Sequence, residues 1–134
     1  MASASPDDLK RVPLFAELDN RQLKKLAGLF RERTVGVGTH VTTEGEMSGV
    51  GFFVVASGEA AVTVGGKDVA TLGPGDHFGE IALLDRGPRS ATVTADTDLV
   101  CRGITLWDFQ PLVLNNPSIA WTLLQTLARK LRGQ

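Results

Sequence analysis

The chain has 134 residues, of which 43% are hydrophobic and 22% charged, and its formal net charge is −1. This length and composition predict one globular domain with a real core, and the near-neutral charge gives no global preference for nucleic acid or an anionic membrane. The single cysteine, Cys101, excludes an internal disulfide and lies in an apolar run, which predicts a buried thiol. The N-terminus lacks the regions of a signal peptide, and no apolar segment is long enough to span a bilayer. We therefore expect a cytoplasmic protein with no membrane partner.

The N-terminal third predicts a polar end followed by helix. Residues 1–8 are polar and predict a frayed terminus, within a polar segment that runs to residue 11. Asp19 and Gln22 have the spacing of a capping box, which predicts a helix at about 20–30. The apolar residues that share one face of this helix are Leu23, Leu26, Ala27 and Phe30.

From about residue 31 the sequence alternates strand-like runs with glycine and proline. The pair Gly65-Gly66 between two such runs is a two-residue hairpin signal. About seven short strands at this spacing predict a sandwich, roll or jelly roll. The expected strands are 31–37, 40–43, 51–57, 59–64, 67–72, 90–95 and 98–104.

The last thirty or so residues predict two helices. Thr105 can cap the first, which runs to about Asn115, and Asn116-Pro117 begins the second. We expect the aromatic residues Phe52, Phe53, Trp107 and Phe109 to belong to the core. The apolar stripe expected on the second helix is Ile119, Ala120, Leu123, Leu124, Leu127, Ala128 and Leu131.

The segment 73–93 carries the chemistry. Residues 79–84 look like a single helical turn inserted between two strands, and the free N–H groups at the start of such a turn attract phosphate. Arg89, ten residues after Gly79, can pair with phosphate oxygens in two parallel hydrogen bonds. The carboxylate of Glu80 is a pure acceptor and suits a sugar hydroxyl. Together these residues predict a site for a phosphate attached to a ribose; a plain surface ion pair between Glu80 and Arg89 is the simpler alternative.

The runs Phe-Gly-Glu-Ile-Ala-Leu-Leu at 78–84 and Pro-Arg-Ser-Ala-Thr-Val at 88–93 resemble the phosphate-binding cassette of cyclic nucleotide-binding domains. This family includes the bacterial catabolite activator protein, regulatory subunits of cyclic-AMP-dependent kinase and nucleotide-gated channels. The glycine-bearing segments 44–46, 57–58 and 72–76 and the run 12–15 also fall where the family has them.

The resemblance covers about residues 12–132 and implies a mainly β fold. We expect one cyclic nucleotide-binding domain over 1–134, built as a jelly-roll-like β-roll (a double-stranded β-helix) with an N-terminal helix and two C-terminal helices. Its parts would be the polar segment 1–11, a helical region 12–30, the roll 31–104 with the cassette at 78–91, and the C-terminal helices 105–132.

The resemblance also implies the site residues. Gly79 and the backbone amides of Ile81 and Ala82 would contact the phosphate or the neighbouring ribose oxygen, and Glu80 would accept from the ribose 2′-hydroxyl. Arg89 would neutralise the cyclic phosphate. The remaining expected ligand residues are Phe78, Ser90 and Ala91 in the cassette, and Val62, Val64 and Leu72 beside the base.

The expected ligand is cyclic AMP, with cyclic GMP as the alternative. Some cyclic-GMP-selective relatives place Thr directly after the arginine, whereas this chain has the shorter Ser90. The C-terminal helix at about 117–132 would act as a lid, with Leu106, Phe109 and Leu112 repacking at its hinge. Arg129 could alternatively reach the base. In the catabolite activator family a long helix continues into a helix-turn-helix DNA-binding domain, and this sequence ends at Gln134.

Other function classes lack their residues. Only two histidines, His40 and His77, are present, Ser90 has no neighbouring base, and no P-loop motif occurs. We therefore expect no catalysis, no metal and no cofactor. The expected partners are a cyclic nucleotide and an unknown protein effector, without nucleic acid binding by this chain alone, in a monomer or weak homodimer. The alternatives are an interaction module that has lost its ligand, and a regulatory fragment of a larger transcription factor, channel, kinase or enzyme.

Overall fold

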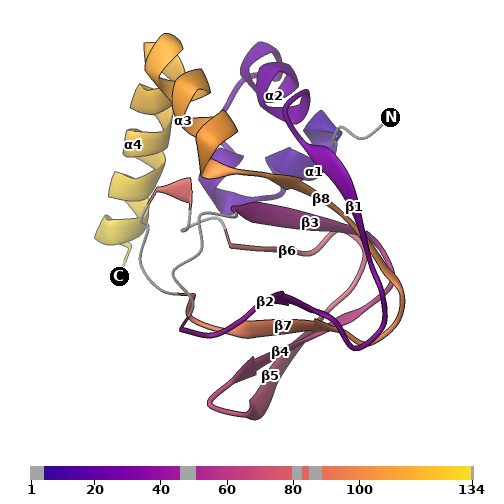
Figure 1. The fold of residues 1–134 in the computed structure, drawn as a ribbon. Coiled ribbons are helices and arrows are strands. Elements are labelled where there is room, and N and C mark those ends of the chain that lie inside the picture. Colours follow the sequence, from indigo (N-terminus) through magenta and orange to yellow (C-terminus); the bar gives the residue numbers. More distant parts are fainter. Residues whose placement is uncertain (1–4, 46–50, 80–82, 85–88, 134) are drawn as a thin grey trace.

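The computed structural model describes residues 5–45, 51–79, 83–84 and 89–133, and its strands form two four-stranded antiparallel sheets. Helices gather at one end of the sheets, and the β4–β5 hairpin projects at the other (Figure 1). The expected mainly β architecture, with helices at both ends of the chain, is confirmed. The first sheet has the order β1 (Arg31–Val35), β8 (Leu99–Ile104), β3 (Phe52–Ser57), β6 (His77–Phe78), and the second has β2 (His40–Thr42), β7 (Thr92–Ala95), β4 (Ala60–Val64), β5 (Lys67–Leu72).

Strand β3 separates two hydrophobic cores. Successive side chains of a strand point to opposite faces, and the first four residues of β3 are all buried. Phe52 and Val54 pack with the helices, while Phe53 and Val55 pack inside the roll. The roll core consists of Val35, Val41, Phe53, Val55, Ala60, Val93, Ala95, Leu99 and Cys101.

The N-terminal segment departs from the expected frayed polar end. Residues Pro6–Lys10 form helix α1, whose start is capped by Ser5: its Oγ accepts a hydrogen bond from the Asp7 N–H at 3.1 Å. Leu9 is fully buried in the helical core, so the hydrophobic contact of one residue orders a segment whose other side chains are polar. A short 3-10 helix, Pro13–Phe15, follows it.

Helix α2 (Asn20–Ala27) has the predicted capping box. The Gln22 N–H donates to Asp19 Oδ1 at 2.8 Å, and the Asp19 N–H donates to Gln22 Oε1 at 3.0 Å. The helix ends three residues before the expected limit, and Phe30 lies just beyond it, still buried.

The two C-terminal helices are α3 (Leu106–Asn115) and α4 (Pro117–Arg132), and Thr105 caps the first as expected. Asn116 stands at the N-cap position of α4 without a side-chain capping bond. Its amide instead donates to Leu112 O at 2.7 Å, and its Oδ1 accepts from Lys25 Nζ at 2.9 Å.

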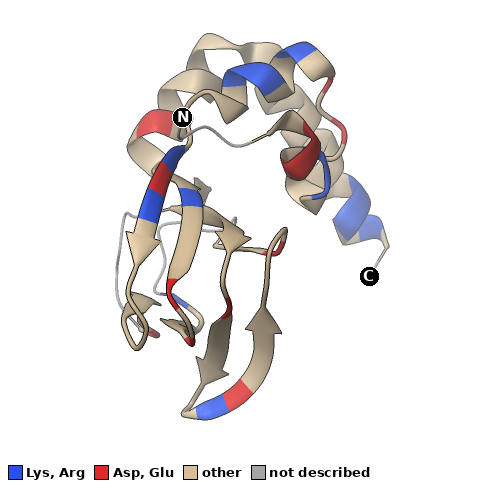
Figure 2. Ribbon diagram, turned by 90° about the vertical axis from the view of Figure 1, so that its right-hand side faces the viewer, with Lys and Arg blue, Asp and Glu red and all other residues tan. Residues whose placement is uncertain are grey.

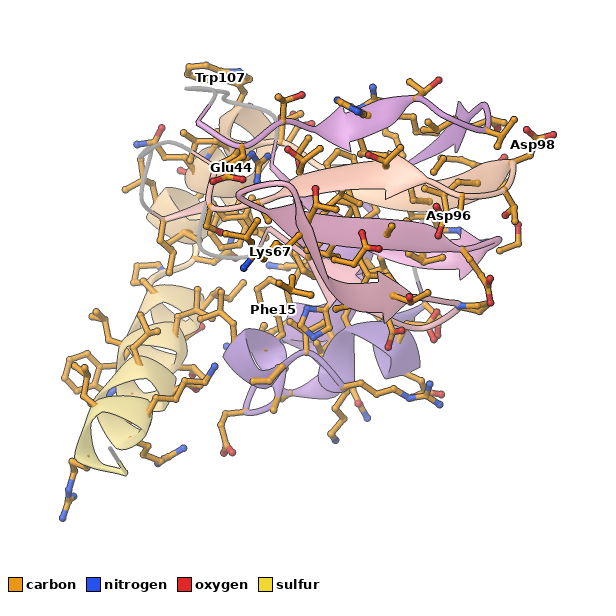
Figure 3. The ribbon with its side chains drawn as sticks, turned by 90° about the horizontal axis from the view of Figure 1, so that it is seen from below. Phe15, Glu44, Lys67, Asp96, Asp98 and Trp107 are labelled. Atoms are coloured by element: carbon orange, nitrogen blue, oxygen red, sulfur yellow. The ribbon has the colours of Figure 1, made fainter. Side chains whose placement is uncertain are left out.

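One expectation about the core of this helical end, that Trp107 belongs to it, was wrong. Trp107 is 59% exposed in the first turn of α3 and lies at the rim of the molecule (Figure 3), while Phe109 is buried. The apolar stripe of α4 is only partly covered: Ile119 and Leu123 are buried, but Leu124 is 57% exposed. A helical stripe predicts which residues share a face and not how much of that face is covered.

The strands fall in the expected places; β5 has the expected bounds, and the other six predicted strands are one or two residues shorter than expected. The β4–β5 hairpin turns at Gly65 and Gly66, which have φ values of 59° and 80°, between the paired residues Val64 and Lys67. This confirms the hairpin signal, since a two-residue turn of this kind needs positive φ at both central positions. The two-residue strand β6 was not predicted. No helix among the described residues is long and apolar enough to cross a membrane.

We predict that Leu9→Ala lowers the free energy of unfolding by about 2–5 kcal/mol, because it leaves a cavity in a fully packed site. The exposed neighbour on the same helix provides the control, Lys10→Ala, which should change it by less than about 0.5 kcal/mol. Urea denaturation followed by circular dichroism measures both. Equal effects of the two substitutions would show that α1 is not anchored through Leu9.

Candidate functional site

A pocket of about 300 Å³ opens between the two sheets where the cassette segment joins them. Strands β2, β4, β5, β6 and β7 each contribute to its wall. The lining residues are Thr42, Val62, Leu72, His77, Phe78, Gly79, Arg89, Ser90, Ala91 and Val93. The strands supply four apolar side chains, from Val62, Leu72, Phe78 and Val93, together with the polar Thr42 and His77, and Arg89 adds a cation.

That cation, the guanidinium of Arg89, is buried, with the residue only 8% exposed. Its Nη2 donates to the carbonyl oxygen of Gly51 at 2.8 Å, and its buried Nε has no hydrogen-bond partner. Within the described part of the chain no carboxylate forms an ion pair with it. Burial lowers the pKa of Arg89 below its usual value, because desolvation disfavours the charged form. A buried cation with unsatisfied donors is stabilised by an anion.

Gly79 leaves room for that guanidinium. Its φ is 91°, and a Cβ at this position would lie 2.7 Å from Gly51 O and 2.9 Å from Arg89 Nη1. Any side chain would therefore press against both the arginine and the carbonyl that holds it. The glycine keeps open the space beside the donors, where a ligand atom can approach.

Hydrogen bonds to the end of β2 fix the backbone around Arg89. The Gly45 N–H donates to Arg89 O at 2.8 Å, and Thr42 Oγ1 donates to Ala91 O at 3.2 Å. The Glu44 N–H donates to Thr92 Oγ1 at 2.9 Å. The arginine thus lines the pocket from a segment whose backbone is held at Arg89 itself and at the residues that follow it.

Glu44 also links the β4–β5 hairpin to this region. Its Oε1 accepts a hydrogen bond from the Gly65 N–H at 2.8 Å, and Figure 3 shows the side chain beside the hairpin. Glu44 is therefore a structural contact between the end of β2 and the hairpin. Glu46 lies outside the described residues.

The structure brings together seven of the residues expected to bind ligand, and they line one pocket: Val62, Leu72, Phe78, Gly79, Arg89, Ser90 and Ala91. Val64 is not among the lining residues; it is 41% exposed at the end of β4, next to the hairpin turn. Glu80, Ile81 and Ala82, and with them most of the expected helical turn, lie outside the described residues.

Sequence reasoning missed Thr42, His77 and Val93 as lining residues. Thr42 and Val93 meet through the pairing of β2 with β7, which joins segments about fifty residues apart and leaves no local signal. Arg129, considered as a base contact, instead pairs with Glu17 at 3.3 Å, and no described residue of α3 or α4 lines this pocket.

A metal centre finds no support in the part of the chain that the structure describes. No group of three or more His, Cys, Asp or Glu side chains comes together there. His40 lies on β2 and His77 on β6, in different sheets.

We predict that Gly79→Ala lowers the free energy of unfolding by on the order of 1–3 kcal/mol, because alanine rarely adopts this φ and its Cβ meets Gly51 O and Arg89 Nη1. Gly73→Ala is the matched control: this glycine lies in the connection before β6, has no positive φ, and its added Cβ would meet nothing within 4 Å. Urea denaturation of the two variants gives the comparison. A loss for Gly73→Ala as large as that for Gly79→Ala would contradict the prediction.

Comparison with known proteins places this pocket in context. The family model of the cyclic nucleotide-binding domain matches residues 32–116. The chain is 47% identical over 107 residues to a cAMP-dependent protein kinase regulatory subunit of Yarrowia lipolytica, covering 78% of this chain but only 28% of that protein.

Solved structures show the same fold. The N-terminal domain of a transcriptional regulator from Streptomyces coelicolor A3(2) superposes with a TM-score of 0.83 at 36% identity, over 95% of this chain and 94% of that one. The regulatory domain of Toxoplasma gondii PKA in co-crystals with cAMP gives a TM-score of 0.70 at 30% identity, over 80% of this chain and 42% of that one. With a matching family model over most of its length, the chain belongs to the cyclic nucleotide-binding domain family.

Proposed function

We propose that this chain is a non-catalytic sensor domain that binds cyclic AMP and passes on its presence through movement of helix α4. One observation carries the proposal: a buried guanidinium, Arg89, reaches the wall of a pocket with an unpartnered Nε. The cyclic phosphate is the anion that this position accepts. A relative named for cAMP dependence and a structural neighbour crystallised with cAMP support the choice of ligand.

The pocket divides into a phosphate end and a base end. Arg89 and the open side of Gly79 form the phosphate end. The side chains of Val62, Leu72 and Val93 give the base an apolar surface to pack against. A volume of about 300 Å³ lies at the lower limit for small-molecule sites and suits a single nucleotide.

The roles of the cassette residues outside the described part rest on the family resemblance. Glu80 would accept from the ribose 2′-hydroxyl, and the amides of Ile81 and Ala82 would donate to the phosphate or the ribose. Ser90, which is exposed beside the pocket, is short and favours cyclic AMP over cyclic GMP in this proposal.

In this structure α4 packs against the N-terminal helices and away from the pocket. Ile119 and Leu123 join the helical core. Three exposed polar contacts add to this docking: Glu17 with Arg129 at 3.3 Å, Gln22 with Ser118 at 3.2 Å, and Lys25 with Asn116 at 2.9 Å.

We propose that this is the open state of a two-state switch. The ligand would draw the cassette inward, the side chains of Leu106, Phe109 and Leu112 would repack, and α4 would close over the base. A ligand shifts such an equilibrium only by as much as it prefers one state over the other. The proposed protein effector reads α4, whose outer surface exposes Trp121, Leu124 and Leu131.

We predict that Arg89→Ala weakens cyclic AMP binding by about 2–5 kcal/mol, because the phosphate loses its charged partner in a buried site. The control is Arg21→Ala, which removes the same charge from an exposed position on α2. Isothermal titration calorimetry measures both affinities, with a thermal melt to show that each variant is folded. Unchanged binding by folded Arg89→Ala would overturn the site assignment.

A second prediction tests the switch. Glu17→Gln removes the partner of Arg129 and should raise cyclic AMP affinity by up to about fivefold, since an exposed ion pair of about 0.2–1 kcal/mol no longer favours the open state. Glu59→Gln makes the same charge change on an exposed residue of the roll and should leave the affinity unchanged. Weaker binding by Glu17→Gln than by Glu59→Gln would contradict the assignment of this structure to the open state.

A further inference from the structure

A second pocket, of about 250 Å³, lies where β1, β8 and β3 approach the helical end of the roll. It shares no lining residue with the nucleotide pocket. Its wall combines an aromatic ring, an aliphatic side chain and two arginines. The lining residues are Arg31, Glu32, Arg33, Phe53, Gly103, Ile104 and Thr105.

The two arginines lie on one face of β1. Arg31 and Arg33 are two residues apart, as is Val35, whose side chain belongs to the roll core. Both arginines are exposed, and in the described part of the chain neither forms an ion pair with a carboxylate. Glu32 lies between them and also lines the pocket, so the lining carries two positive charges and one negative charge and is positive on balance. Figure 2 shows the two blue segments on either side of the red one on this strand.

Phe53 forms the apolar wall, and two groups pack against its ring. The Phe78 ring stacks on it with centroids 5.2 Å apart and an interplanar angle of 26°, and the Arg33 guanidinium carbon lies 5.8 Å from its centroid. Gly103 stands directly opposite Phe53 in the strand pairing. A Cβ at Gly103 would come within 2.6 Å of two carbons of the Phe53 ring, so the ring fits here only because residue 103 has no side chain.

These features specify the chemistry of an occupant. Paired guanidinium groups bind a carboxylate through charge-assisted hydrogen bonds, and the ring with Ile104 offers apolar contact beside them. The volume limits the apolar part to a single ring or a short branched chain. We propose that this pocket is an accessory site for a small aromatic or branched aliphatic carboxylate.

The second pocket lies close to the pocket that contains Arg89, so a ligand in one can affect the other. Phe78, the stacking partner of Phe53, lines the nucleotide pocket, so the pair of rings is a wall shared by both sites. A ligand that contacts Phe53 from one side can therefore be sensed at Phe78 on the other. The binding itself does not depend on the proposed function, because it needs no nucleotide.

The probe for the test is benzoate, titrated into the isotopically labelled full chain without nucleotide and followed by amide NMR. We expect saturable shifts at residues 31–33, Phe53, Phe78 and 103–105, with a dissociation constant on the order of 1 mM for a ligand of this size. Benzamide, which has the ring without the charge, and acetate, which has the charge without the ring, should each bind at least about tenfold more weakly.

Three variants separate a built site from general attraction to positive charge. Arg31→Gln and Arg33→Gln should each weaken benzoate binding about tenfold, as expected for a lost charge-assisted contact. Lys67→Gln makes the same charge change on the distant hairpin, where Figure 3 shows Lys67, and should leave the affinity within about twofold. Thermal melts show whether each variant is folded. Shifts that stay linear in benzoate concentration, or equal losses for Lys67→Gln and the two arginine variants, would overturn the proposal.

Discussion

The guanidinium of Arg89 is buried, and the free energy cost of that burial constrains the structure around it. Among the described residues, one hydrogen bond to a main-chain carbonyl, that of Gly51, satisfies only a fraction of its five N–H donors. The backbone of Arg89 and of the residues that follow it is bonded to residues 42–45, which fixes the point from which the side chain starts. An arginine held in this way is prepared for an anion, and the folded chain carries the free-energy cost of burying its charge.

Strand β3 connects the two hydrophobic cores of the molecule. Because β3 is buried on both faces, it joins the helical core to the roll core, and the aromatic residues of the two faces lie at neighbouring positions of one strand. Phe52 contacts Phe15 edge to face with ring centroids 5.6 Å apart on the helical side. Phe53 stacks on Phe78 on the roll side. The cassette segment begins at Phe78, which stacks on β3, and the other face of β3 packs against the helices. Only this strand therefore lies between Phe78 and the helical core.

The sequence predicted what depends on local geometry and missed what depends on distant contacts. The Asp19 capping box and the Gly65-Gly66 turn need only residues that are neighbours in the chain, and both are present as predicted. Helix α1 was missed although Ser5 caps it locally, because its five residues are too few to show helical periodicity and Leu9 anchors it through tertiary contacts. Strand β6 has two residues, too few to show any alternation, and exists through its pairing with β3.

The candidate site divides in the same way. The cassette pattern around Gly79 and Arg89 led to the pocket, because it is a local run of sequence that resembles a known family. Thr42 and Val93 enter the pocket through strand pairing alone, and Val64, expected beside the base, ends near the exposed turn. Trp107 was expected in the core because it is a large aromatic residue. The sequence does not indicate which face of α3 is left uncovered, and Trp107 lies on that face.

The most direct test of the central claim is a calorimetric titration of the unaltered chain with cyclic AMP, with 5′-AMP titrated in parallel. The account predicts saturable binding of one cyclic AMP per chain and at least about tenfold weaker binding of 5′-AMP, whose doubly charged, open phosphate does not match a pocket with one buried guanidinium. No heat of binding with either nucleotide, or equal affinity for both, would contradict it.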